Sequence, residues 1–590
     1  MLELNLAPVS FDYAYTGMPP SKHTTRATAQ TPDDAEAHNL RGIAYSENGD
    51  QDRAIATFSK VIELSPDLAD AYNNRGVAYN IKGDYDRAIQ DFNKAIQLHS
   101  DHANAYNNRG NAYSDKGEYE RAIQDYNIAI QLDPQPVEAY NNRGIVYYHK
   151  HNYDRAINDF TKSIELKPDY AKAYNNRGVA YRDENDYDRA IDDFNAAIKL
   201  NPRSADPYSN RGTVYHSKDE LDRAIEEYDT AIQLKPNFAE AYNNRGIAYR
   251  DKSEIDRAIE DHDKALELNP DLVEAYNSRG ITYCRKGEYD RAIVDCNRAI
   301  QLKSNYASAY NTRGIAYRDK DEVDRAIEDL NKAIQLDPQL AEAYSNRGVA
   351  YRKKGDVDRA IEDYDKAIEL EPEAVEPYNN RGIAYCSIGE YNRAIEDYTK
   401  AIQLRPELAV PYNNRGNTYN NKGEYDRAIV DLNKAITLES DYAEAYYNRG
   451  EVWLRLQEWD KTRADLTVAR DLEMDIIAAF HNAHENVETY QRANGVKLPT
   501  DVAKMLTVSA MRNEEVSEAT HGLSSDAEIA KSLDPKLAGK NPMAQRIIEA
   551  VEQSYDVTME DAEALLQVIK ENQMPVRFDS PFGANDQESQ

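Results

Sequence analysis

The sequence AYNNRG at residues 241–246 recurs with small changes along most of this 590-residue chain. Its arginine and glycine occur together thirteen times, always 34 residues apart, with no insertion or deletion between copies. The arginines of these pairs are Arg41, Arg75, Arg109, Arg143, Arg177, Arg211, Arg245, Arg279, Arg313, Arg347, Arg381, Arg415 and Arg449. A fixed period of this length is typical of stacked supersecondary units. The sequence therefore predicts one long array of repeats with a tail at each end.

Each repeat contains two amphipathic segments. In the repeat at 239–272, AEAYNNRGIAYRDKSEIDRAIEDHDKALELNPDL, they run from 239 to about 252 and from 254 to about 268. Seven repeats place glycine between the segments, where a tight turn needs a residue that tolerates positive φ. Proline follows the second segment in nine repeats, because it cannot continue a helix interior. The repeat is therefore predicted to be a helical hairpin.

Numbered from its first residue, the repeat keeps Gly at position 8, Tyr at 11, Ala at 20, often an aromatic residue at 24, Ala at 27 and often Pro at 32. The repeat at 171–204 shows them as Gly178, Tyr181, Ala190, Phe194, Ala197 and Pro202. This pattern resembles the tetratricopeptide repeat (TPR). The resemblance implies an all-α, right-handed α-solenoid superhelix of about 13 tandem hairpins whose first helices line a concave groove.

The rest of the chain lacks the period. Residues before the array are rich in Pro, Ser and Thr, and those after it include one amphipathic segment that would cover the end of the stack. The residues of that segment on one helical face are Phe480, Ala483, Val487 and Tyr490. We therefore predict a disordered tail at 1–34, thirteen repeats at 35–476, a capping helix at 477–496, and a polar linker with short helices, partly disordered, at 497–590.

Position 7 is arginine in all thirteen repeats, although the TPR consensus usually has leucine there. At about 100° per residue, this position shares a face of the first helix with the conserved glycine and tyrosine, which must pack against neighbouring helices. Position 23, on the second helix, is acidic in twelve of thirteen repeats. A charge at a packed face is seldom left without a partner. The sequence predicts an ion pair between the two positions, such as Arg245 with Asp261.

The opposite face of the first helix carries asparagine at position 6 in ten repeats. These residues are Asn74, Asn108, Asn142, Asn176, Asn210, Asn244, Asn346, Asn380, Asn414 and Asn448. A carboxamide can pair with both the N–H and the C=O of an extended peptide. The row resembles the asparagine ladder in the TPR superhelix of the O-linked N-acetylglucosamine transferases, which implies peptide binding. The alternative is a local hydrogen bond between helices.

The asparagine row is broken at Ser278 and Thr312, and positions 12 and 13 become basic in this region. The basic residues are Arg182, Arg250, Arg285, Arg318, Arg352 and Lys353. We expect Arg250, Arg318 and Arg352 in particular to bind acidic side chains of a peptide ligand. No repeat has lysine at position 5, so the carboxylate clamp of co-chaperone TPR domains is not predicted.

Composition narrows the possible partners and the compartment. The formal net charge of −32 disfavours nucleic acid and anionic membranes. The three cysteines are odd in number and lack paired spacing, which favours a reducing compartment. The first residues show neither a basic region nor a long apolar run, so no signal peptide or membrane span is predicted there. We expect a cytoplasmic protein.

No catalytic motif is recognisable. The sequence has no phosphate-binding loop, nucleophile elbow, zinc-type cysteine pair or dinucleotide fingerprint, and the pair His481 and His484 lacks a third ligand signal. We therefore predict no catalytic residues, metal, cofactor or small-molecule substrate, and a scaffold that binds partner proteins or extended peptides. One alternative is a targeting or regulatory subunit that recruits a separate enzyme through its C-terminal helices, and another is an unrecognised enzyme within 498–590.

Overall fold

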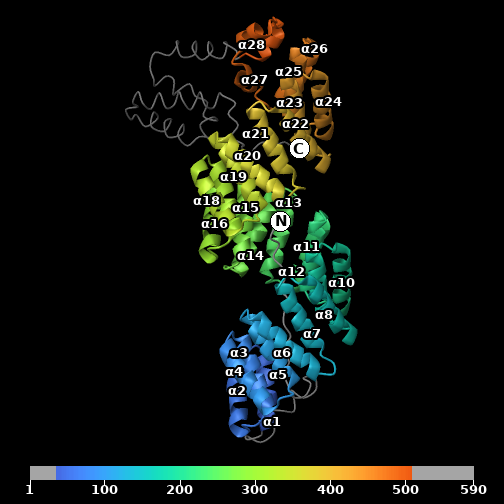
Figure 1. The fold of residues 1–590 in the computed structure, drawn as a ribbon, viewed down its shortest axis with the longest axis vertical. Helices are drawn as coiled ribbons and strands as arrows, with labels where there is room; N and C mark the ends of the chain where they lie inside the picture. The colour runs from blue at the N-terminus through green and yellow to red at the C-terminus, as the bar shows by residue number, and fades with distance from the viewer. Residues whose placement is uncertain (1–34, 508–590) are drawn as a thin grey trace, which may run out of the picture. The chain divides into compact units, whose positions relative to one another are not determined.

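The computed structural model describes residues 35–507, and all regular structure within this range is helical. The chain divides into two compact units at Pro338, and each unit is described by itself. In both units the helices follow one another as antiparallel pairs (Figure 1). The first unit contains α1 (Ala35–Glu47), α2 (Gln51–Leu64), α3 (Ala69–Ile81), α4 (Tyr85–Leu98), α5 (Ala103–Asp115), α6 (Tyr119–Leu132), α7 (Val137–His149), α8 (Tyr153–Leu166), α9 (Ala171–Asp183), α10 (Tyr187–Leu200), α11 (Asp206–Ser217), α12 (Leu221–Leu234), α13 (Ala239–Asp251), α14 (Ile255–Leu268), α15 (Val273–Lys286), α16 (Tyr289–Leu302), α17 (Ala307–Asp319) and α18 (Val323–Leu336).

The second unit continues the same pattern and ends with three shorter helices. Its helices are α19 (Ala341–Lys354), α20 (Val357–Leu370), α21 (Val375–Ser387), α22 (Tyr391–Leu404), α23 (Ala409–Lys422), α24 (Tyr425–Leu438), α25 (Ala443–Arg455), α26 (Trp459–Asp471), α27 (Ile476–His484), α28 (Val487–Asn494) and α29 (Thr500–Met505). The predicted all-α array of helical hairpins is therefore confirmed.

The turn inside each hairpin has one residue in the left-handed region. Gly287 is there with φ of 79°, and Ser253 takes the equivalent place with φ of 64° in a repeat that lacks glycine. The chain then enters the second helix, which ends where the next residue becomes extended, as at Asn269 after α14. One short turn thus reverses the chain and makes the two helices antiparallel neighbours.

The core of a hairpin forms where position 8 meets position 24. A Cβ on Gly178 would lie 2.8 Å from Cε1 of Phe194, so only glycine lets the ring approach the first helix this closely. Ala190 and Ala197, on either side of the phenylalanine, are fully buried. Small residues on both helices thus make room for one large side chain per repeat.

The capping helix predicted over 477–496 is wrong as a single element, because the structure has two helices, α27 and α28. Glu485 adopts φ of 66° and ends α27, and the side chain of Asn486 then caps α28 by accepting a hydrogen bond from the Thr489 amide. Of the residues expected on one face, Ala483 is exposed while Phe480 and Tyr490 are buried. The break turns α28 so that Tyr490 still reaches the same core.

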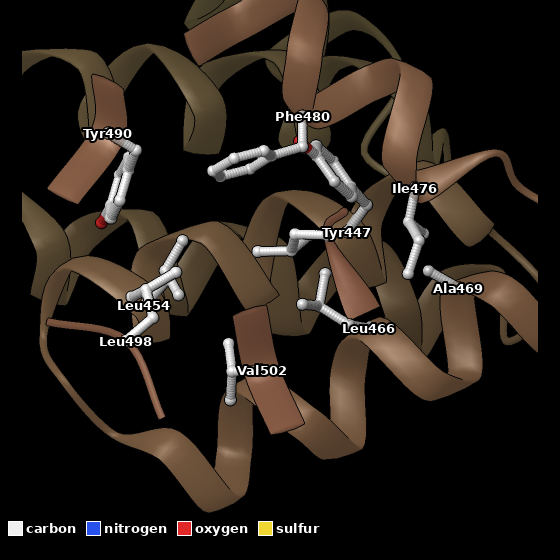
Figure 2. Close-up of a cluster of buried hydrophobic side chains, with 10 residues drawn as sticks. Tyr447, Leu454, Leu466, Ala469, Ile476, Phe480, Tyr490, Leu498 and Val502 are labelled. Carbon is white, nitrogen blue, oxygen red and sulfur yellow. The ribbon is translucent and has the colours of Figure 1, made fainter. Parts of the chain in front are cut away.

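These last helices close the array with the largest apolar cluster of the second unit (Figure 2). Phe480 and Tyr490 have their ring centroids 5.5 Å apart. Leu498 and Val502 come from the segment in which LPTD at 498–501 starts α29. The cluster rests on Tyr447, Leu454, Leu466 and Ala469 of the last hairpin. The tail predicted at 1–34 and the short helices predicted beyond 507 lie outside the described residues.

Candidate functional site

The first polar feature of the array is the arginine at position 7. The Nε and Nη2 atoms of Arg245 donate to the two carboxylate oxygens of Asp261 at 2.7 and 2.6 Å. Burial by itself would lower the pKa of the Arg245 guanidinium, but the hydrogen bonds and the charges of Asp261 and Asp229 together outweigh it and raise that pKa above its usual value. The predicted ion pair is confirmed, and the same bidentate geometry holds Arg109 to Asp125 and Arg415 to Asp431.

The arginine also has a third contact that the sequence did not suggest. Its Nη1 atom donates to position 25 of the preceding hairpin, as from Arg245 to Asp229, from Arg109 to Asn93 and from Arg177 to Thr161. Position 25 varies among Asn, Asp, Ser and Thr, but all of these accept a hydrogen bond. Each arginine thus joins three helices, and we call this set of contacts the arginine row.

The second polar feature is the row of asparagines, which we call the carboxamide row. The side chain at position 6 donates from Nδ2 to Oδ1 of the asparagine at position 5 of the preceding hairpin. Asn108 bonds to Asn73 at 3.0 Å, Asn176 to Asn141 at 3.0 Å, and Asn448 to Asn413 at 2.9 Å. Asn74, Asn142, Asn210 and Asn414 make the same bond, at 2.9–3.2 Å. The row therefore links first helices that are neighbours in the stack.

Burial differs between the two units along this row. The predicted site residues of the first unit, Asn74 to Asn244, are buried between the helices that they join. In the second unit Asn448 is buried, whereas Asn346, Asn380 and Asn414 are half-buried. The carboxamides of the second unit are therefore the more accessible ones.

The two ends of the carboxamide row match the two ends of the array. The first repeat has Asn39 at position 5, which accepts from Asn74, but leucine at position 6, where no earlier hairpin could pair with it. The last repeat has Asn448 at position 6 but Tyr447 at position 5, and this tyrosine packs into the cap. The residues change only on the side that has no neighbouring repeat, so the row serves contacts between hairpins.

The row does not use all of its hydrogen-bonding capacity. Within residues 35–507, the buried Nδ2 atoms of Asn107 and Asn243 have no hydrogen-bond partner, and neither has Oδ1 of Asn277. A buried polar group without a partner costs about 1–3 kcal/mol. The last two residues lie at the break in the row, where Ser278 and Thr312 replace the asparagine of the next repeat.

The predicted basic residues fall into different environments. The guanidinium of Arg250 is fully buried and pairs with Asp251, so this side chain is not exposed on the face of the helix. Arg318 pairs with the adjacent Asp319 at 2.7 Å, and Arg352 is half-buried. Arg285, which sequence analysis placed in the same zone, keeps 49% of its side chain exposed. The zone therefore combines buried and accessible arginines.

The histidines of the C-terminal helices have structural partners. Nε2 of His484 lies 2.8 Å from Oε1 of Glu451, which also accepts from the hydroxyl of Tyr447 at 3.0 Å. Nε2 of His481 lies 3.2 Å from the backbone oxygen of Leu506. No group of three potential metal ligands occurs among the described residues, and no helix between 35 and 507 is long and apolar enough to cross a membrane.

Stacked helical hairpins linked by repeated polar contacts define an α-solenoid repeat protein. Models described as TPR repeat match residues 44–80, 110–150, 212–252, 314–355 and 416–457. Models described as tetratricopeptide repeat match 69–102, 137–170, 171–204, 239–272, 273–306, 341–373 and 375–408, and a further one matches 23–56, 92–124 and 397–430. The chain belongs to the tetratricopeptide repeat family.

One of two similar solved structures supports this fold. The crystal structure of the APC/C hetero-tetramer Cut9-Hcn1 has a chain similar to this one with a TM-score of 0.54 and 16% identity, covering 80% of this chain and 96% of that one. A tetratricopeptide repeat protein from Parabacteroides merdae covers 42% of this chain and 98% of its own, with 23% identity and a TM-score of 0.36. No curated protein matches the sequence.

Proposed function

We propose that the protein is a cytoplasmic scaffold that binds extended segments of partner proteins along the first helices of its hairpins and has no catalytic activity of its own. Members of the TPR family typically mediate protein–protein interaction. The observation that carries the proposal for this chain is the carboxamide row. In it, the Nδ2 groups of Asn107 and Asn243 are donors without a hydrogen-bond partner among the described residues. A backbone carbonyl of an extended peptide is the acceptor that such a donor would take.

The burial of the row shapes the proposed binding mode. Because the carboxamides of the first unit are bonded across hairpins, a peptide reaches them only when neighbouring first helices separate slightly. The bonds between asparagines would then be exchanged for bonds to the peptide, at little net cost. Asn346, Asn380 and Asn414 in the second unit are half-buried and need less rearrangement. A peptide would therefore bind the second unit with less rearrangement than the first.

The test is affinity capture from the native lysate with three forms of the full chain. One form carries Asn142, Asn176, Asn210 and Asn244 changed to alanine. A matched control carries the same number of changes at exposed amides on second helices, Gln90, Gln124, Gln131 and Asn158 to alanine. We expect partners of the unchanged chain to be lost only from the first form, provided that its helical circular dichroism and its unfolding midpoint at the assay temperature show an intact stack.

Equal capture by all three forms would place the binding surface elsewhere. Since the changed asparagines are buried, a variant with a single change supports the result. Asn107→Asp keeps Oδ1, the acceptor for Asn142, and replaces the Nδ2 donor with a second carboxylate oxygen, so its unfolding midpoint must show that the added buried charge leaves the stack folded. This variant should weaken capture if the donor contacts ligand, and should leave it unchanged if the row only joins hairpins.

Recruitment of a separate enzyme through the C-terminal helices is the competing proposal, and a truncation separates the two. Leu498, Val502 and Leu506 belong to the apolar cluster under the cap, so a chain cut before residue 498 would expose the rest of that cluster. The chain should be cut after residue 507. A scaffold that binds with its array keeps its partners after this cut, whereas a recruiter loses one of them.

A further inference from the structure

A third set of contacts joins the first helices beside the carboxamide row. The side chain at position 12 bonds to the acidic residue at position 13 of the next hairpin. Asn80 donates to Asp115 at 2.8 Å, the hydroxyl of Tyr148 donates to Asp183 at 2.5 Å, and Nε2 of His216 lies 3.1 Å from Asp251. In each contact a donor of one repeat meets a carboxylate of the following repeat.

Within the first unit, two steps of this set have a cation at position 12 but no acidic residue at position 13 of the next hairpin. Arg182 is followed by Ser217 in the next hairpin, and Arg250 is followed by Arg285. Arg182 is only 5% exposed and turns back to its own neighbour Asp183, with Nε at 2.8 Å and Nη2 at 2.7 Å from the same oxygen. Its buried Nη1 atom has no hydrogen-bond partner among residues 35–507.

Arg250 and Arg285 are cations on adjacent first helices with one carboxylate between them. Asp251 lies 3.1 Å from Nε of Arg250 and 3.2 Å from Nη1 of Arg285. Arg285 also donates to the backbone oxygen of Arg250 at 3.1 Å. Burial would raise the pKa of Asp251, but the hydrogen bond from His216 and the charge of Arg250 outweigh it and lower that pKa to about 2. Asp251 therefore stays ionised and holds both arginines in place.

Positions 12 and 13 of the first helices α9, α11, α13 and α15 together carry three arginines and two carboxylates, so this set of residues is net positive and rich in donors. Tyr148 and His216 already occupy part of the acceptor capacity of the two carboxylates. Guanidinium groups bind carboxylates with short, charge-assisted hydrogen bonds. This set of residues has room for a further anionic acceptor to balance its positive charge. Such a group would arrive from solvent at the half-exposed Arg285.

We propose that Arg285 and, when neighbouring first helices separate slightly, the buried Arg250 and Arg182 form an anion site that binds the carboxylates of an acidic peptide segment lying across α9 to α15. The proposal rests on the proposed peptide-binding function and gives it a ligand chemistry. Neighbouring helices pack roughly 10 Å apart, and an extended chain advances about 3.3 Å per residue. An acidic residue at every third position of the peptide therefore matches the spacing of the hairpins.

Peptide fits this site better than nucleic acid does. Asp183 and Asp251 lie beside Arg182 and Arg250, and the chain as a whole carries a net charge of −32. A nucleic acid strand would bring a phosphate close to each of these carboxylates, whereas a peptide with spaced acidic residues leaves gaps opposite them. An oligonucleotide is therefore a useful competitor in the test.

The test uses fluorescence anisotropy with the full chain and labelled probes at 0.15 M salt, where the long-range repulsion from the acidic surface is screened beyond about 8 Å. The probes are the peptides (Gly-Gly-Glu)4 and (Gly-Gly-Gln)4 and the oligonucleotide dT12. The site variant is Arg182→Gln with Arg285→Gln. The matched control is Arg291→Gln with Arg325→Gln, which removes the same charge from exposed arginines paired with Glu288 and Glu322.

We expect the glutamate peptide to bind the unchanged chain and the control at least tenfold more tightly than the site variant. Should burial of Arg182 make the double variant unstable, Arg285→Gln alone should still weaken binding severalfold, because this side chain is half exposed. No binding of the glutamate peptide, or equal affinity in all forms, would overturn the proposal. So would dT12 binding that depends on the same arginines.

The glutamine peptide distinguishes failure of this proposal from failure of the proposed function. If it binds as tightly as the glutamate peptide, the array recognises the peptide backbone, and the proposal of an anion site is wrong. If neither peptide binds, the anion site is also wrong, while peptide binding by the array is still decided by the capture experiment with the asparagine variants.

Discussion

The arginine row and the carboxamide row run along the same first helices about 100° apart, yet only one of them is interrupted. The arginine row continues through Arg245, Arg279 and Arg313, each of which makes a bidentate pair with the aspartate of its own hairpin. In the same three repeats the carboxamide row loses its partners at Ser278 and Thr312.

The difference teaches which contact the fold requires. The arginine ties together three helices through charged groups, and losing it leaves a buried carboxylate without its partner. A carboxamide bond is neutral and joins two helices, so one member can change at a modest cost. Residue changes such as Ser278 and Thr312 are therefore found in the carboxamide row and not in the arginine row. Arg182, Arg250 and Arg285 lie at positions 12 and 13, beside the carboxamide row.

The largest expected effect comes from breaking the arginine row. Arg245→Leu leaves Asp261, whose side chain is 9% exposed, without its bidentate partner, and removes a bond from Asp229. We expect the free energy of unfolding of this repeat to fall by about 3 kcal/mol. Hydrogen exchange of α13 and α14 during urea titration measures this locally, which matters because each repeat touches only its neighbours and unfolding should be multistep.

The double change Arg245→Leu with Asp261→Leu should recover most of that loss, since the stranded carboxylate is gone. Part of the loss in unfolding free energy should persist, because Asp229 still lacks its arginine partner. This part should disappear on adding Asp229→Asn, since asparagine occurs at the equivalent position in other repeats, as at Asn93. Strictly additive effects of the single changes would refute the coupling between position 7 and position 23.

The next effect should come from breaking the carboxamide row where it is intact. Asn142 donates to Asn107 at 3.2 Å and to Asn111 at 3.1 Å, so Asn142→Ala strands buried acceptors and should cost about 2 kcal/mol. The measurement is the same local hydrogen exchange, read at α5 and α7. A loss as large as that for Arg245→Leu would contradict the ranking of the two rows.

A pH-dependent effect is expected at the interruption itself. His262 takes the position that eight of the other twelve repeats fill with Phe or Tyr, and its Nδ1 lies 3.0 Å from Oδ1 of Asn243. Complete burial lowers its pKa well below 6.5, so the folded state holds neutral histidine and the unfolded state binds the extra proton. The stability is therefore full above pH 6.5 and falls as the pH drops below it, by up to about 2 kcal/mol at pH 5.

His262→Phe should remove this slope between pH 7.5 and pH 5, whatever it does to the stability at pH 7.5, where it strands Asn243. Chemical denaturation of both forms across this range gives the difference, which cancels the other histidines. An unchanged slope in the variant would mean that His262 does not titrate on unfolding.

Much of the fold could be predicted, because the 34-residue period fixes the hairpin and the helical repeat fixes which positions share a face. The Arg245 to Asp261 pair was found in this way. Its bond to Asp229 was not, because position 25 keeps only the ability to accept a hydrogen bond and varies in residue type. The break at Glu485 was also missed, since only the positive φ of a non-glycine residue and the Asn486 cap reveal it.

The candidate site was harder to predict from periodicity, because a face that repeats does not show whether its side chains meet a ligand or the next hairpin. Leu40 and Tyr447 are the residues that could have indicated contacts between hairpins. Each replaces asparagine only where no neighbouring repeat exists to bond with it. Burial of Arg250 could not be foreseen either, since it depends on Asp251 and Arg285 coming together from two hairpins.

The smallest expected effect is a gain that comes from repairing the carboxamide row. Ser278→Asn places a carboxamide opposite Asn243, whose Nδ2 has no partner among the described residues and whose Oδ1 contacts His262. We expect a stabilisation of about 1 kcal/mol, read as slower hydrogen exchange of α13 and α15. If Ser278 and Thr312 are neutral substitutions without a role in binding, this variant keeps its affinity for (Gly-Gly-Glu)4. If the interruption lets the first helices separate around a ligand, the repaired row holds them together, and stability and affinity should change in opposite directions.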